Sequence, residues 1–286
     1  MGTCIEIWSA VFIDGVFIDK LFSQEFYLDA FQAKSVLRLG RICSALKHCY
    51  LKLKQHYRMI DLKVVPSDEH LYPRPLPIEG FGVIPKLKYT GKLSHNGTCI
   101  PVVQEPDDDP EARRERPYAI YRAKLAKGDV EVEVVVKFTT RYNADAHNLL
   151  HGQGLAPELH YFARLVGDHY MVVADYVDSA PLSNCPKQEN YLDILKQVER
   201  ALDLLHGNDL VFGDLRPENI LLDPRKGVKL IDFDFVGTHG VDRYPASFNT
   251  TIQPKGVERH GIMDKKHDIA MLNNLRKFLE GTNGSG

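Results

Sequence analysis

The stretch "LVFGDLRPENILL" (210–222), followed closely by "VKLIDFDFVG" (228–237), holds acidic and amide side chains within apolar sequence. These polar residues are Asp214, Asn219, Asp232 and Asp234. An unpaired charge in apolar surroundings is costly. Carboxylates at the ends of apolar strands therefore indicate a place that binds a cation or moves a proton, and we expect the two blocks to form one functional site.

The bulk properties of the chain exclude several classes of protein. Its 286 residues are enough for one large domain or for two lobes around a cleft. Its net charge of −2 gives no overall attraction to nucleic acid or to an anionic membrane. No apolar run approaches the roughly 18–20 residues of a membrane span. The five cysteines are scattered and odd in number, so we expect neither a zinc site nor a disulfide framework, and we expect an intracellular, cytoplasmic protein.

Residues 1–64 are predicted to form an N-terminal helical segment. From Phe22 to Met59 the apolar residues recur three or four positions apart, or at sums of these spacings, as in an amphipathic helix; they are Leu28, Phe31, Leu39, Ile42, Leu46, Tyr50, Leu53 and Tyr57. We expect this face to pack on the domain's own core, with partner binding as the less favoured alternative. Residues 65–85 are rich in proline and glycine and are predicted to be a linker, and residues 281–286 a flexible tail.

The remaining chain divides into a β-rich part and a helical part. Residues 86–178 should hold two short strands, a charged loop at 105–117, a β-hairpin over 118–138 that turns at Gly128 and Asp129, a helix near 142–151, and a second hairpin about Gly167 and Asp168. A helix is predicted over 191–206, with Leu192, Leu195, Val198, Leu202 and Leu205 on one face. This order predicts an α+β protein of two lobes, with residues 179–280 as the helical lobe.

Four elements in one order resemble the protein-kinase-like superfamily. The segment "GDLRPENILL" is similar to its catalytic loop, in which an Asp precedes an Asn by five positions, here Asp214 and Asn219. Asp232 is similar to the metal-binding Asp that follows that loop, and Lys137 in "VVVKF" to the Lys that ends the third strand of the small lobe. The resemblance covers residues 118–279. It is closest to short fungal kinase-like proteins, through "KFTTRYNADAHNLLHGQGLAPELH" (137–160).

This resemblance implies a bilobal fold with a truncated helical lobe and a site that uses ATP and Mg²⁺. Asp232 and Asn219 would hold Mg²⁺, for which oxygen ligands suit. The resemblance to aminoglycoside and choline kinases suggests that Asp234 adds a metal contact, and a backbone-capping role is the alternative. Asp214 would accept the proton of the acceptor hydroxyl, and Lys137 would pair with the α- and β-phosphates.

Further site residues come from the same resemblance. Arg216 matches a position where the family commonly has a Lys that steadies the γ-phosphate. The segment "HYMVVADYVDSAPL" (169–182) resembles the strand and hinge at the adenine, where the backbone of Asp175 and Val177 would bond the base and Ala174 would be a small gatekeeper. Asp268 would buttress the catalytic loop by accepting backbone N–H bonds.

The sequence also departs from the family pattern. No GxGxxG loop precedes Lys137, and only Gly91 and Gly97 offer a substitute. The helix that should supply a Glu partner for Lys137 offers Asp145, with His147 as the less favoured alternative. An ordinary solvated acid of the helix is an equally favoured reading of Asp145. Phe212 and Gly213 replace the usual His-Arg before the catalytic Asp.

The reading that best fits these features is a phosphotransferase that passes the γ-phosphate of ATP to a protein Ser/Thr or another hydroxyl. The partners expected are ATP and an acceptor that the sequence does not identify, without nucleic acid and without a membrane span. A pseudokinase that uses the cleft as a nucleotide-binding or scaffold module is one alternative. A small-molecule kinase of the aminoglycoside or choline type is the other.

Overall fold

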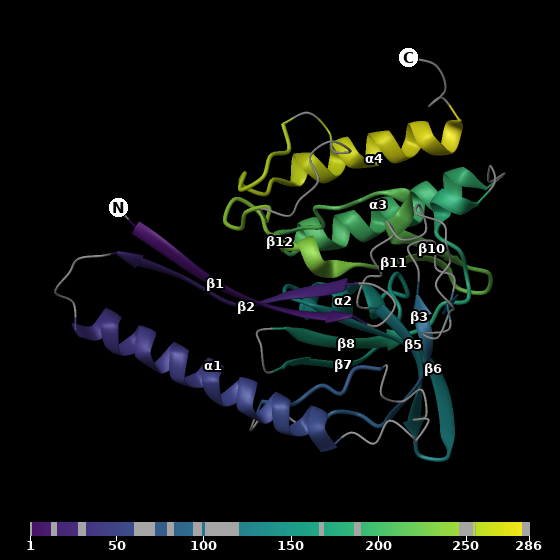
Figure 1. Ribbon diagram of the computed structural model, residues 1–286. Coiled ribbons are helices and arrows are strands. Elements are labelled where there is room, and N and C mark those ends of the chain that lie inside the picture. Colours follow the sequence, from purple (N-terminus) through teal and green to yellow (C-terminus); the bar gives the residue numbers. More distant parts are fainter. Residues whose placement is uncertain are drawn as a thin grey trace. The chain divides into compact units, whose positions relative to one another are not determined.

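The computed structural model describes residues 2–12, 16–27, 33–59, 72–78, 83–93, 99–100, 120–165, 169–185, 190–245, 254 and 256–281. They fall into two compact units. The first is built from two strands and a helix near the N-terminus, and the second runs from β3 to α4 and contains all of the predicted site residues (Figure 1).

The first unit begins with a β-hairpin that was not predicted. Strands β1 (Gly2–Phe12) and β2 (Val16–Tyr27) pair antiparallel, with Phe12 opposite Val16. The expectation of a helical segment from residue 1 is therefore wrong for residues 2–12 and 16–27. The signal was present in the sequence, because Asp-Gly at 14–15 between two runs rich in β-branched and aromatic residues is a strong local indication of a hairpin.

The predicted helix follows as α1 (Ala33–Met59). We had expected its apolar face to pack on a core, but the described side chains of this face are largely exposed. Leu46, Tyr50, Leu53 and Tyr57 are 41–69 % exposed, and only Leu39 and Ile42 are half-buried among the side chains described from Val36 to Met59.

The small lobe of the second unit is one antiparallel sheet, as predicted. Its strands are β3 (Leu87–Leu93), β4 (Cys99–Ile100), β5 (Ile120–Lys127), β6 (Val130–Thr139), β7 (Leu159–Arg164) and β8 (Tyr170–Asp175). They lie in the order β4-β3-β5-β6-β8-β7. Alternation in β6 buries Val134 and Val136 against Met171 and Val173 of β8, which fixes the position of Lys137 at the next residue.

Helix α2 (Ala144–His151) connects this sheet to the large lobe. Asn143 caps it by accepting a hydrogen bond from the Ala146 N–H (3.0 Å), and Gly152 ends it as predicted. Its buried residues Ala146 and Leu150 belong to the hydrophobic core of the large lobe. The chain that leaves β6 is therefore anchored on the lobe that carries the acidic blocks.

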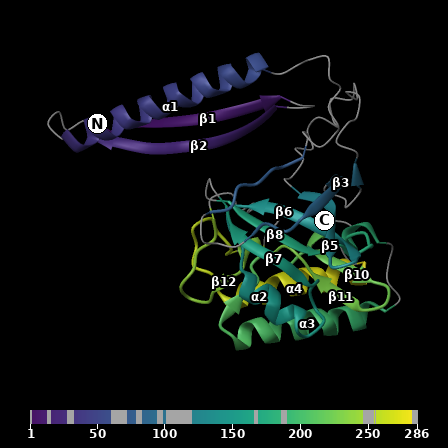
Figure 2. The same cartoon turned by 90° about the horizontal axis from the view of Figure 1, so that it is seen from below.

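The large lobe is formed by α3 (Tyr191–Gly207) and α4 (Lys265–Glu280), which pack against each other, and by short strands (Figure 2). The short elements are η3 (Leu182–Asn184), β9 (Leu210–Val211), η4 (Pro217–Asn219), β10 (Ile220–Asp223), β11 (Gly227–Leu230), η5 (Phe233–Phe235) and β12 (Gly237–Thr238). The predicted face of α3 is buried except Leu192, which is 58 % exposed because it lies in the first turn, and Ile194 is buried instead.

Several expectations fall on residues that the structure does not describe. These are the charged loop at 105–117, the turn at Gly167 and Asp168, Gly97 and the tail beyond Gly281. Of the predicted linker, residues 72–78 and 83–85 lack helix and strand apart from an isolated bridge between Pro77 and Leu165. None of the described helices is both long enough and apolar enough to cross a bilayer.

Candidate active site

The catalytic-loop segment between β9 and β10 holds Asp214 and Asn219 against each other. The Asn219 side-chain amide donates to the backbone carbonyl and to Oδ2 of Asp214, both at 2.9 Å. Arg216 Nε lies 3.2 Å from the same Oδ2. Both Asp214 and Asn219 are buried, at 3 % and 4 % exposure. The five-residue spacing is therefore what lets the amide close a tight loop on the carboxylate.

Asp268 supports this loop from α4. It is fully buried, and its two oxygens accept the backbone N–H groups of Phe212 and Gly213, each at 2.8 Å. The His206 ring nitrogen Nε2 lies 2.9 Å from the same carboxylate. The predicted buttress is confirmed by these contacts, and hydrogen bonds to a charged acceptor are among the stronger ones in proteins.

Gly213 explains why the loop departs from the family pattern just before Asp214. Its φ of +79° lies in the left-handed region, which favours glycine. A Cβ at this position would lie 2.7 Å from Cε of Met263 and 3.0 Å from the carbonyl oxygen of Phe235. There is no room for an arginine, or for any side chain, unless the neighbouring segment moves.

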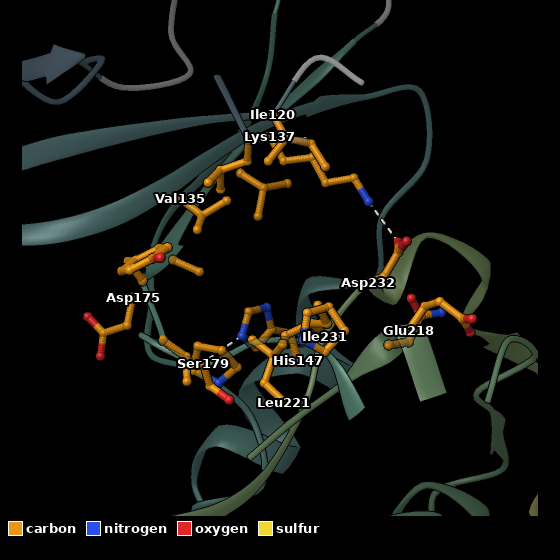
Figure 3. A pocket seen from close by; sticks show the side chains of 18 of the residues that line it. Ile120, Val135, Lys137, His147, Asp175, Ser179, Glu218, Leu221, Ile231 and Asp232 are labelled. Atoms are coloured by element: carbon orange, nitrogen blue, oxygen red, sulfur yellow. Dashed lines mark hydrogen bonds and ion pairs between the residues drawn. The ribbon is translucent and has the colours of Figure 1, made fainter. Parts of the chain in front are cut away.

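Lys137 reaches Asp232 across the cleft between the lobes. Its ammonium nitrogen donates to Asp232 Oδ1 at 2.7 Å, and the side chains are 18 % and 33 % exposed (Figure 3). Asp232 has φ +67°, ψ +70°. A left-handed backbone at a non-glycine residue is uncommon and costs energy, so this position is held by its surroundings in an unfavourable conformation, as functional residues often are.

Asp234 completes an ion cluster around Lys137. Its Oδ1 lies 2.8 Å from Lys137 Nζ, and its Oδ2 accepts the Thr139 hydroxyl at 2.8 Å. Burial, with the repulsion of the Asp232 carboxylate, raises the pKa of Asp234 to about 6 against the attraction of Lys137. For Asp232 burial acts in the same direction, but Lys137 outweighs it and the pKa is lowered.

Asp145 does not pair with Lys137, and the alternative reading, an ordinary solvated acid, holds. It lies exposed in the first turn of α2, and the carboxylates of Asp232 and Asp234 contact the ammonium group instead. No local pattern in the sequence indicates the contact between Thr139 and Asp234, because this contact depends on how β6 meets the large lobe.

His147, the second alternative for Lys137, has another role. It is buried, its Nε2 donates to the Pro157 carbonyl (2.9 Å), and its ring stacks on Phe233 with centroids 4.6 Å apart. Burial lowers the pKa of His147 to about 4, so the ring is neutral. It ties α2 to the turn that carries Asp232 and Asp234.

An apolar cavity extends from Lys137 toward the predicted hinge. Leu93, Ile120 and Val135 of the small lobe face Leu221 and Ile231 of the large lobe across it (Figure 3). Ala174 and Val177 also line it, whereas the Asp175 carboxylate points away and accepts from His160 Nε2 at 2.6 Å. Most of the predicted site residues line this cavity: Lys137, Ala174, Asp175, Val177, Arg216, Asn219 and Asp232. Asp214 contacts Asn219 and Asp234 contacts Lys137, whereas Asp145 is exposed outside it.

The side chains at the inner end of this cavity suit a hard divalent cation. The side-chain amide nitrogen of Asn219 donates to Asp214, so the side-chain oxygen Oδ1 of Asn219 remains to act as a ligand. Asp234 Oδ1 is buried and lies 2.8 Å from Lys137 Nζ, beside Asp232 Oδ1 on the same ammonium group. Oxygen donors of this kind are the ligands that Mg²⁺ prefers, so Asn219, Asp232 and Asp234 are the candidates to hold it.

Comparisons with known proteins give the same picture. The family model "Protein kinase domain" matches residues 148–253. The chain is 38 % identical over 73 residues to a Drosophila melanogaster cGMP-dependent protein kinase, isozyme 2 forms cD5/T2, covering 26 % of this chain and 8 % of that one. It is 47 % identical over 58 residues to Ovis aries cyclin-dependent kinase 4, covering 20 % and 19 %. The chain therefore spans less than a fifth of the length of these curated relatives.

A solved structure extends the likeness to about two thirds of the chain. It is titled "Structure of the Cydia pomonella Granulovirus kinase, PK-1"; it superimposes with a TM-score of 0.51 at 19 % identity and covers 68 % of this chain and 69 % of that chain. The predicted fold class is confirmed: the chain has a bilobal, kinase-like α+β fold.

Proposed function

We propose that this chain is an ATP- and Mg²⁺-dependent phosphotransferase of the protein-kinase-like superfamily, which passes the γ-phosphate to a hydroxyl of a protein Ser/Thr or of another acceptor. The observation that carries the proposal is the 2.7 Å contact between Lys137 of the small lobe and Asp232 of the large lobe. It lies at the inner end of an apolar cavity that also reaches Asn219 and Arg216.

Each polar residue has a role in this proposal. Lys137 pairs with the phosphates of ATP, and Arg216 adds positive charge on the other side of Asp214. Asn219, Asp232 and Asp234 hold Mg²⁺, which neutralises negative charge on the phosphate oxygens when it is bound. Asp214 accepts the proton of the attacking hydroxyl, and its carboxylate is kept in place by the Asn219 amide.

Asp234 also positions Lys137. In kinases a helix Glu holds this lysine, but here Asp145 is exposed and Asp234 makes the contact. Asp234 is in turn fixed by the Thr139 hydroxyl, two residues beyond Lys137 on the same strand. Lys137 thus keeps a carboxylate partner when Asp232 binds metal.

The adenine of ATP would occupy the apolar cavity and bond the hinge. The Asp175 N–H donates to the Glu158 carbonyl, and the Tyr176 N–H donates to the Glu133 carbonyl. The Asp175 carbonyl is the acceptor that we assign to the base edge. The Val177 N–H is the donor that we assign to the same base edge.

Nucleotide binding and turnover test the proposal together. At about one hundred times Kd, ATP with Mg²⁺ should stabilise the fold by about 2.7 kcal/mol, and Asp232→Asn should remove most of the metal-dependent part. Asp214→Asn should bind nucleotide normally and lose turnover. Asp145→Asn is the matched control, since an exposed acid beside the site should change neither measurement.

Two results would reject parts of the proposal. No shift of the melting temperature at millimolar ATP would exclude a nucleotide site. A normal shift with equal phosphate release by wild type and Asp214→Asn would favour the rival, a pseudokinase used as a scaffold. That rival is supported by the ion cluster, which occupies Lys137 on both sides.

The acceptor remains the open part of the proposal. Asp234, which stands where the family has a glycine, favours a small-molecule kinase of the aminoglycoside or choline type. A phosphorylation screen with hydroxylated metabolites and peptides would separate these acceptors. The closer relation to short fungal kinase-like proteins and the cytoplasmic location stay predictions.

A further inference from the structure

Helix α1 of the first unit carries charge of one sign only. Within Ala33–Met59 there are seven Lys or Arg residues and no Asp or Glu. The whole chain has a net charge of −2 and α1 has one of +7, so the rest of the chain carries −9. The candidate active site uses none of the basic residues of α1.

Six of the apolar residues of α1 form a stripe on one face, and the four from Leu46 to Tyr57 are exposed. At 3.6 residues per turn, Leu39, Ile42, Leu46, Tyr50, Leu53 and Tyr57 lie on the same face. Tyr50, Leu53 and Tyr57 are 62 %, 53 % and 69 % exposed. Such a long apolar stripe on a surface indicates a binding site, since soluble proteins rarely leave one in water.

Basic residues flank this stripe on both sides. At about 100° per residue, Arg38 on one side and Lys47 and Lys54 on the other lie within about 100° of the middle of the stripe, and Arg41, Lys52 and Arg58 lie further round the helix; all six are exposed. Long basic side chains in these positions can lay their methylene stems along an apolar layer and keep their charge at its surface. The two tyrosines add rings with one apolar and one polar end, which suit such a boundary.

We propose that α1 binds flat on an anionic lipid bilayer, with the stripe in the headgroup region and the flanking basic residues, Arg38, Lys47 and Lys54 nearest, over the lipid phosphates. A bilayer offers an apolar layer beneath a continuous negative surface, which matches charge on both edges along the length of the helix. An acidic groove of a protein would need its carboxylates in two parallel rows. The interaction is peripheral, because α1 is not apolar enough to span.

Vesicle binding by the full chain tests this proposal. The probes are vesicles of phosphatidylcholine alone and of phosphatidylcholine with about 30 % phosphatidylserine, separated by sedimentation. We expect at least about tenfold stronger binding to the anionic vesicles at 0.1 M salt and loss of that difference at 0.5 M. Equal binding to both vesicles, or binding to neither, would overturn the proposal.

Matched variants separate the stripe from the rest of the helix. Leu46→Gln with Leu53→Gln should abolish binding, whereas Leu37→Gln with Leu51→Gln, exposed residues on the opposite side, should leave it unchanged. Lys52→Gln with Lys54→Gln should weaken binding about tenfold, and Lys196→Gln with Lys226→Gln, exposed in the large lobe, should not.

Other occupants of the stripe would give different results. A different outcome is that the chain self-associates and does not bind vesicles, and that the Leu46→Gln, Leu53→Gln double variant loses the self-association. That result would show that a second copy covers the stripe and would refute the lipid proposal. The nucleotide-dependent shift of the melting temperature should be the same in all of these variants. Failure of vesicle binding is thus distinguishable from failure of the proposed kinase activity.

Discussion

The Asp234→Asn variant removes one buried negative charge beside Lys137 and keeps the shape of the side chain. In the wild type Asp234 lies 2.8 Å from Lys137 Nζ and accepts the Thr139 hydroxyl. Its pKa of about 6, against 3.8 for an ordinary aspartate, means that the folded protein resists ionising it, even with the attraction of Lys137.

This pKa sets the size and the sign of the effect on stability. A rise of about two units corresponds to about 3 kcal/mol at 1.36 kcal/mol per unit, which the ionised carboxylate costs the fold at pH 7. Weakening the hydrogen bond from Thr139 costs about 1 kcal/mol in the other direction. Without ligand, Asp234→Asn should therefore be about 2 kcal/mol more stable than wild type at pH 7.

The pH dependence gives the effect a signature. Because the folded-state pKa lies above the unfolded one, the folded state binds more protons between about pH 4 and 6, and wild-type stability falls as the pH rises through this window. The advantage of Asp234→Asn should grow by about 1 kcal/mol between pH 5 and pH 7. Urea unfolding at both pH values measures it, with Asp203→Asn, an exposed acid of α3, as the control.

The same substitution should weaken function. Lys137 would depend on Asp232 alone, and the metal would lose a candidate ligand, so the stabilisation by ATP with Mg²⁺ should shrink. A variant that is less stable than wild type at pH 7, or whose stability difference is the same at pH 5 and pH 7, would refute our account of the cluster.

Three further predictions concern the loop and the cavity. Gly213→Ala should lose about 2 kcal/mol more stability in urea than Gly240→Ala, because both have a left-handed φ but only Gly213 lacks room for a Cβ; equal losses would contradict this. Asp268→Asn should cost about 3 kcal/mol, since two backbone N–H groups lose a charged acceptor, and a loss under 1 kcal/mol would show that the loop does not depend on it. Ala174→Met should exclude ATP analogues enlarged at the adenine N6 from the cavity while leaving ATP binding intact, which a competition thermal-shift assay would detect; unchanged binding of the enlarged analogues would mean that Ala174 does not border the base.

Local features of the chain were predictable because they depend on neighbours in the sequence. The valines of β6, the buried face of α3 and the short spacing between Asp214 and Asn219 each follow from periodicity or from a loop a few residues long. The buttress from Asp268 was found as well, through the family resemblance. The N-terminal hairpin was missed although its Asp-Gly signal is local, because the helical period of the following residues was extended too far upstream.

What the sequence by itself determined is the set of elements and the kind of side chain that each one carries. Only the tertiary structure decided which side chains meet. Lys137 pairs with Asp232 and Asp234, 95 residues and more away, while Asp145, eight residues away, stays in water. The tertiary structure also left the apolar stripe of α1 exposed, and it requires glycine at 213 through a φ of +79° and the nearby carbonyl of Phe235. Such contacts depend on how packed lobes approach each other, and the free energy that selects them is summed over the whole core, not over the residues adjacent in the chain.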